Sequence, residues 1–190
     1  MTILRTSVVL LGCVLGSAWA LGEETSAKAP TYFRQDGGIA AEDAVSLPAR
    51  LDLPAHLRWR EVMDSGHSTP VLWEKKIFLT TFRPAARELA TVALDRETGR
   101  LLWRRVASTK RIESFHPAYG SPAAPSPACD GQRLVVFFGS CGLLCYDLEG
   151  NLLWEHPLGP FQDEFGTGSS PILAENKVIQ SANKADTCLT

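Results

Sequence analysis

The chain contains the stretch ALDRETGRLLW at residues 93–103 and a related stretch, CYDLEGNLLW, at residues 145–154. Each has an apolar strand end, an Asp, a short polar turn with a Gly, and a second apolar run that ends in Leu-Leu-Trp. The pattern predicts the same β-hairpin twice. Trp103 and Trp154 carry a large apolar area at the same point of each hairpin, so we expect both to pack between adjacent sheets.

The turn residues support this interpretation. Asp95 and Asp147 can bind backbone amides of the turns that they begin. Gly99 and Gly150 can adopt the positive φ that such turns often require. This role in the turn accounts for both Asp residues, so we do not interpret them as catalytic.

A second repeated element precedes each hairpin and appears a third time near the C-terminus. Its three copies are STPVLWEKKIFL at residues 68–79, PSPACDGQRLVV at 125–136 and SSPILAENKVIQ at 169–180. In every copy an aliphatic residue follows a Pro by seven positions, with a polar turn between them. This predicts a short strand, a turn and a second strand, with Pro at a strand start, where a missing amide is tolerated.

Joined in order, the two elements form a four-stranded antiparallel unit. Its Pro residues, Pro70, Pro127 and Pro171, recur at intervals of 57 and 44 residues, and the first interval is longer because of an extended loop at residues 108–124. A four-stranded unit with this period is typical of β-propeller blades. We therefore predict an all-β fold, a partial propeller with a lone strand at residues 56–59, two complete blades and about half of another.

The pattern Ala-x-Asp-x-x-Thr-Gly-x-x-x-Trp, complete at residues 93–103, resembles the repeat of pyrroloquinoline-quinone-type propellers. The copy at 145–154 departs from it by Cys145, a shorter turn and no Thr, whereas residues 66–70 and 166–171 resemble the starts of innermost strands. The resemblance covers about residues 56–190. It implies a seven- or eight-bladed ring, of which this chain would be an N-terminal fragment, and the family includes quinoprotein dehydrogenases and outer-membrane assembly lipoproteins.

The N-terminus predicts export. Residues 1–20 have one basic residue, an apolar run too short to span a bilayer, and an Ala-x-Ala site, which is the pattern of a signal peptide cleaved after Ala20. An alternative is a lipobox that ends at Cys13, which would anchor the protein through a lipid. We expect a periplasmic or secreted protein with a leader or linker at residues 21–55, an incomplete propeller at 56–190 and no membrane-spanning segment in the mature chain.

The net charge argues against a nucleic-acid partner, and the cysteine spacing argues against a zinc or haem site. Removal of residues 1–20 would take away Arg5 and change the net charge from −2 to −3. The sequence shows no clustered basic face of the kind that nucleic-acid binding requires, so we expect no nucleic-acid partner. Four cysteines would remain, with no zinc or haem spacing. We expect them to be small buried residues, while the disulfide pairing stays open. They are Cys129, Cys141, Cys145 and Cys188.

No residue in this sequence identifies a catalytic or metal site. The candidates for the mouth of the central channel are His67, Ser68, His116, Ser126 and Ser170. A Ser near a His suggests a hydrolase, but there is no Gly-x-Ser-x-Gly elbow and no third group to orient either His. We expect these side chains to form hydrogen bonds within the loop mouths.

Two functions remain open. The first is a non-catalytic scaffold that binds other envelope or secreted proteins. The alternative is a quinoprotein oxidoreductase whose cofactor site lies in blades beyond this sequence. Pyrroloquinoline quinone and calcium are implied here only by the resemblance. We favour the scaffold, because propeller folds host many functions and the fold decides none of them.

Overall fold

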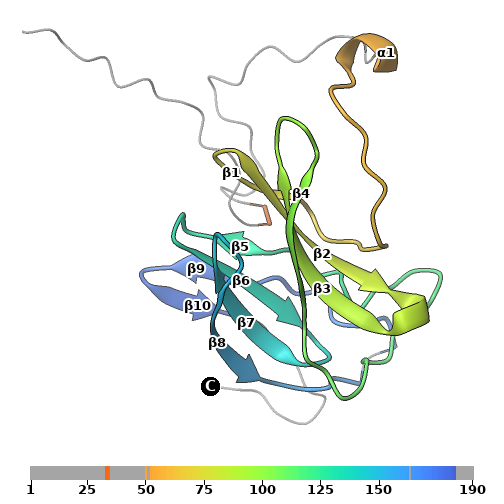
Figure 1. Cartoon of the computed structure of the whole chain (residues 1–190). Coiled ribbons are helices and arrows are strands. Elements are labelled where there is room, and N and C mark those ends of the chain that lie inside the picture. Colours follow the sequence, from red (N-terminus) through yellow and green to blue (C-terminus); the bar gives the residue numbers. More distant parts are fainter. Residues whose placement is uncertain (1–32, 35–49, 51, 163, 183–190) are drawn as a thin grey trace, which may run out of the picture.

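The computed structural model describes residues 33–34, 50, 52–162 and 164–182. The predicted signal peptide, Cys13 and Cys188 lie outside these residues, as does most of the predicted leader. The described part contains one short helix, α1 (Leu53–His56), one 3-10 helix, η2 (Pro84–Ala86), and three antiparallel sheets (Figure 1).

Two sheets have four strands each, in chain order, and one has two. The first contains β1 (Val71–Trp73), β2 (Lys76–Arg83), β3 (Glu88–Asp95) and β4 (Leu101–Val106). The second contains β5 (Ala128–Cys129), β6 (Arg133–Phe138), β7 (Gly142–Asp147) and β8 (Leu152–Pro157). The third contains β9 (Ile172–Ala174) and β10 (Lys177–Ile179). The prediction of an all-β, partial propeller with two four-stranded blades and half of another is confirmed.

The turns between β3 and β4 and between β7 and β8 depend on the predicted Asp and Gly residues. The Oδ1 atom of Asp95 accepts hydrogen bonds from the Thr98 hydroxyl at 2.7 Å and the Thr98 amide at 2.8 Å. These bonds hold the pKa of Asp95 below its usual range. Gly99 has a φ of +74°, a backbone conformation that glycine adopts without steric cost.

Trp103 lies between the first two blades, as predicted. Its ring centroid is 5.9 Å from that of Phe78 on β2 and 6.1 Å from that of Tyr146 on β7, and only 8% of the residue is exposed. The indole Nε1 donates a hydrogen bond to the Leu148 carbonyl at 3.0 Å. Its ring lies so close to Gly150 that a Cβ there would meet it at 2.7 Å. Trp103 thus joins the core of one blade to the turn of the next.

Trp154 differs from this expectation, because it is 38% exposed. The strands described for the third sheet are β9 and β10, so within the described residues no counterpart of β7 covers this ring. The prediction that Trp154 packs between sheets is therefore not met in the described part of the chain.

The predicted lone strand at residues 56–59 is wrong. His56 ends α1, and residues 57–64 join no described sheet; an isolated bridge from Ser65 to Phe82 follows them. Trp59 nevertheless docks as Trp103 does, since its Nε1 donates to the Arg96 carbonyl at 2.9 Å and its ring lies against Gly99. A strand needs a neighbouring strand for its backbone hydrogen bonds, whereas an indole needs only the turn on which it rests.

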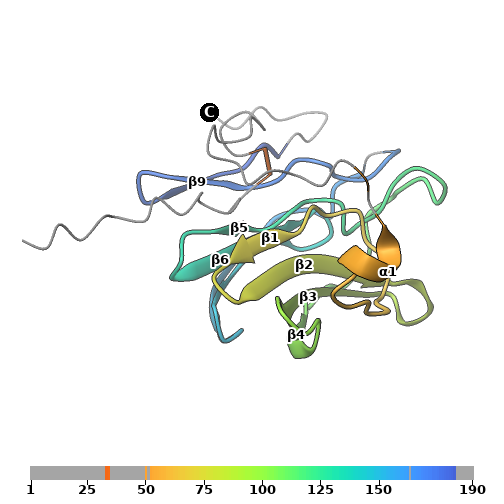
Figure 2. The same cartoon turned by 90° about the horizontal axis from the view of Figure 1, so that it is seen from above.

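The connections between strands gather at two opposite ends of the stacked sheets (Figures 1 and 2). We call one end the loop face; it comprises residues 84–87, 107–124, 139–141, 158–162 and 164–168. We call the other end the turn face; it comprises residues 74–75, 96–99, 130–132 and 148–150. The docked tryptophans meet the turn face, while the long connections between blades belong to the loop face.

Candidate functional site

The serines at the starts of the first strands join one blade to the next. Thr69 of the first blade donates its amide to the Ser126 Oγ at 2.8 Å, and Ser126 donates its amide to the Ser170 Oγ at 2.9 Å. The three residues occupy the same position, directly before the repeated Pro. We call this series the serine stitch; it uses both predicted hydroxyls as acceptors for backbone amides.

Ser68 acts within its own blade. Its Oγ donates to the Thr80 carbonyl at 3.3 Å and accepts the Thr80 amide at 3.0 Å. The residue at the same position in the third blade, Ser169, donates to the Ser181 carbonyl at 2.6 Å. His67 is exposed and its amide donates to the Ala123 carbonyl at 3.1 Å.

His116 lies apart from these serines, in an aromatic group on the loop face. Its ring stacks on Tyr119 at 4.7 Å and on Phe165 at 6.3 Å between centroids, and its Nδ1 accepts the Ala118 amide at 3.2 Å. Tyr119 is 77% exposed and Phe165 is 55% exposed. Among the hydrogen bonds of the described residues, none joins His67 or His116 to a serine hydroxyl, so the five candidates do not form one constellation. That they face a central channel stays a prediction.

The buried Glu113 holds the long loop in place. Its Oε2 accepts the Thr167 hydroxyl at 2.6 Å and the Thr167 amide at 3.2 Å, and its own amide donates to the Ser140 Oγ at 3.0 Å. Gly139 lies so close to this carboxylate that a Cβ could not fit. Through its amide and its carboxylate, Glu113 thus connects the loop after the first blade, the β6–β7 turn and the segment that leads to the third blade. The sequence did not indicate this role, because a lone Glu in a loop usually belongs to a solvated surface.

Two hollows lie beside this loop. The first, of about 580 Å³, runs between residues 108–111 and 157–161. The second, of about 430 Å³, lies between residues 112–115 and Arg87. Exposed basic side chains border them, and within the described residues none of the three forms an ion pair; they are Arg87, Lys110 and Arg111. We call the first hollow the basic groove.

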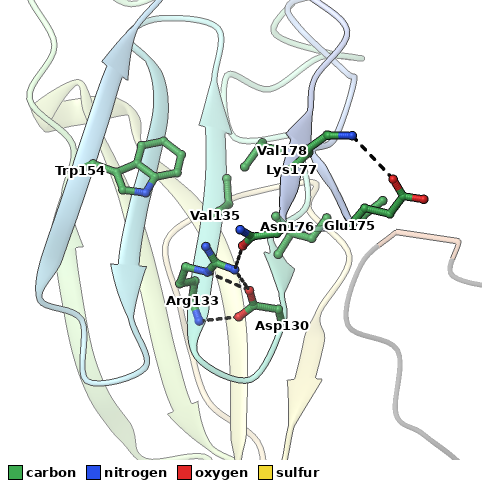
Figure 3. Close-up of a pocket in the computed structure, with 10 residues that line it drawn as sticks. Asp130, Arg133, Val135, Trp154, Glu175, Asn176, Lys177 and Val178 are labelled. Carbon is green, nitrogen blue, oxygen red and sulfur yellow. Dashed lines mark hydrogen bonds and ion pairs between the residues drawn. The ribbon is translucent and has the colours of Figure 1, made fainter.

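Another pocket, of about 150 Å³, lies between the second blade and the β9–β10 hairpin (Figure 3). Arg133 points to Asp130, with 2.8 Å between Nη2 and Oδ2, and the same Nη2 donates to the Asn176 Oδ1 at 2.8 Å. Trp154 and Val135 line its apolar side. Since its polar groups already bind one another, this pocket is a seam between blades.

The described cysteines are free and poorly ionised. Burial raises the pKa of Cys129 to about 11 and that of Cys145 to about 11. Burial also raises the pKa of Cys141 to about 12, with the charges of Glu155 and Glu113 adding to the effect. Thiols that stay protonated at neutral pH are weak nucleophiles and weak metal ligands. The expectation of small buried residues is met by Cys129 and Cys145, whereas Cys141 is half-buried.

The quinone and calcium implied by the resemblance can be compared with the residues present. Calcium requires several oxygen ligands from carboxylates and carbonyls. Within the described residues, no three His, Cys, Asp or Glu side chains come close enough together to hold a metal ion. The Glu113 carboxylate already binds Thr167. The described residues therefore do not fit a calcium-bound quinone, and no step is derived through one.

Comparison with known proteins decides the family. A family model described as "Outer membrane protein assembly factor BamB" matches residues 51–189. The chain belongs to this family. The match to the BamB family confirms the resemblance to pyrroloquinoline-quinone-type repeats, which the turn and Trp pattern suggested.

Among solved structures, the chain is similar to "The crystal structure of BamB from Moraxella catarrhalis", with 14% sequence identity and a TM-score of 0.47. The match covers 65% of this chain and 37% of that BamB chain. Our chain thus spans well under half of the length of that BamB. A search of curated protein sequences found no significant match. No helix in the described part of the chain is both long and apolar enough to cross a bilayer.

Proposed function

We propose that the chain belongs to an exported, non-catalytic propeller that binds other envelope proteins on its loop face. Residues 1–20 would direct it to the periplasm or the exterior, with a lipid anchor at Cys13 as an alternative to cleavage after Ala20. Membership of a family described as an outer-membrane protein assembly factor supports a role in holding proteins together. The oxidoreductase alternative rests on resemblance alone.

One observation carries this proposal: the long loop is fixed from inside and presents aromatic side chains outside. Glu113 is 2% exposed and binds Thr167, while Tyr119 and Phe165 of the same surface are 77% and 55% exposed. Aromatic residues are enriched in the cores of protein interfaces, and Tyr and Trp are frequent among the residues that contribute most binding energy. A loop that is ordered before binding loses little conformational entropy when a partner docks.

The serine stitch indicates that the strand starts hold the blades together, which leaves the loops to bind partners. Polar side chains at the strand starts connect blades, since Ser126 and Ser170 accept amides from the blade before each of them. Side chains that connect blades are engaged in architecture. The loops that extend beyond the blades are free to differ and to carry binding, as surface loops on rigid scaffolds commonly do.

Photo-cross-linking in living cells tests this function. A photo-reactive amino acid replaces Tyr119 on the loop face of the full chain, and in a second variant it replaces Glu97, which is exposed on the turn face. After illumination, mass spectrometry identifies the cross-linked proteins. We expect a defined envelope protein to be linked to position 119 and absent from position 97. The same set of proteins at both positions, or no adduct at 119, would refute loop-face docking.

A further inference from the structure

The basic groove has a chemistry of its own. Lys110 and Arg111 stand exposed at one rim, and its opposite wall is formed by Leu158, Pro160 and Phe161. The whole chain has a net charge of −2, whereas this rim carries two adjacent cations. A groove with a cationic rim and an apolar wall is complementary to carboxylates that flank an apolar side chain.

The rim is held in position before any partner arrives. The Thr109 hydroxyl donates to the Arg111 carbonyl at 2.8 Å and lies 3.3 Å from the Ser140 carbonyl. One guanidinium nitrogen of Arg111, Nη2, donates to the Gln162 Oε1 at 2.6 Å. A guanidinium has five N–H donors, so Arg111 keeps several for a carboxylate, while Lys110 has no hydrogen bond or ion pair among the described residues.

We propose that the basic groove binds an acidic, extended segment of a partner protein, with an apolar side chain against Leu158 and Phe161. The inference rests on the proposed function and specifies the chemistry of the partner. Carboxylates beside Lys110 and Arg111 form charge-assisted hydrogen bonds. The charge pattern thereby selects among envelope proteins, because like charges at the same rim would repel a basic segment.

A competing occupant is the segment that follows Ala182 in the same chain, because Ala182 also lines the groove. Residues 183–190 contain one cation, Lys184, and one anion, Asp186. A segment with balanced charge gains less from a rim with two cations than an acidic segment does. The charge of the rim therefore favours a partner.

Fluorescence anisotropy tests the inference with a labelled peptide, Glu-Asp-Phe-Asp-Glu, and the full chain. The peptide with the opposite charges, Lys-Arg-Phe-Arg-Lys, serves as a comparison. We expect the acidic peptide to bind and the basic one not to bind. Raising sodium chloride from about 50 mM to about 300 mM should weaken the binding, because salt screens exposed charges.

Matched variants locate the site. Lys110→Glu together with Arg111→Glu should weaken binding about tenfold, and Lys110→Glu alone, which leaves the Gln162 contact intact, about threefold. Lys75→Glu with Arg100→Glu makes the same charge change at exposed residues near the turn face and should leave affinity unchanged. Circular dichroism verifies that all variants fold.

Three results would overturn the groove. They are unchanged affinity in the Lys110 and Arg111 variants, an equal loss of affinity in the turn-face control, and tighter peptide binding in Asp186→Lys, which would mean that residues after Ala182 occupy the groove. If any of these results is found while the chain with the photo-reactive residue at position 119 still forms its cross-link, only the assignment of the groove as the binding site is refuted. If that chain also forms no cross-link, the proposed function is refuted as well.

Discussion

Removal of the Ser126 hydroxyl should weaken the seam between the first two blades. Ser126 is 3% exposed, and its Oγ accepts the Thr69 amide at 2.8 Å. In Ser126→Ala this amide loses its acceptor. A buried donor left without a partner costs about 1–3 kcal/mol. Because Thr69 is itself exposed, water can reach part of the site, so we expect the lower part of that range, about 1–1.5 kcal/mol.

Urea denaturation followed by tryptophan fluorescence measures this cost, since Trp103 lies buried at the same seam. The matched control is Ser108→Ala, an exposed serine with no hydrogen bond among those of the described residues, which should change the free energy of unfolding by less than about 0.5 kcal/mol. The slope of the free energy against urea should stay constant. If Ser126→Ala costs no more than Ser108→Ala, the serine stitch does not stabilise the fold.

Three further outcomes follow from burial and ionisation. Trp103→Ala should cost about 3–5 kcal/mol in the same denaturation assay, and Trp154→Ala, at 38% exposure, clearly less; equal losses would contradict the difference in packing. The Asn151 side chain and nearby amides lower the pKa of Asp147, so its contribution to stability is complete above the ordinary pKa of 3.8 and is lost as the pH falls through the lower folded value; Asp147→Asn should flatten that acid loss, and an unchanged pH profile would refute it. Cys141, with a pKa of about 12, should react slowly with iodoacetamide at neutral pH and quickly in denaturant, as peptide mapping would show; fast labelling of the native protein would mean that the thiol is ionised.

The hairpin turns could be predicted because their causes are local. Asp95 and Gly99 lie four residues apart, and each acts on the backbone beside it. The prediction of a strand at residues 56–59 was wrong, because a strand depends on a neighbouring strand that the local sequence does not reveal. Trp59 resembled Trp103 in sequence and kept its docking contact, but the backbone around it did not pair.

The candidate site was predictable only in outline. The extra length at residues 108–124 was visible as a longer interval between repeats, and this loop carries His116 and Tyr119 of the aromatic group. The role of Glu113 was not visible, because its partner Thr167 lies 54 residues away. A small residue such as Gly139, opposite the carboxylate, is a weak signal that becomes informative only in three dimensions.

The serine stitch has a directional property. Ser126 accepts a bond from the blade before it through its side chain and donates one to the blade after it through its backbone. Because the same residue is a hydrogen-bond acceptor on one side and a donor on the other, it can be copied along with its blade, and each new copy can bond to both neighbours without any change to them. Tandem duplication of the coding sequence could therefore lengthen such an array one unit at a time, which leaves the packing of the wide side chains between blades to determine how many units close a ring.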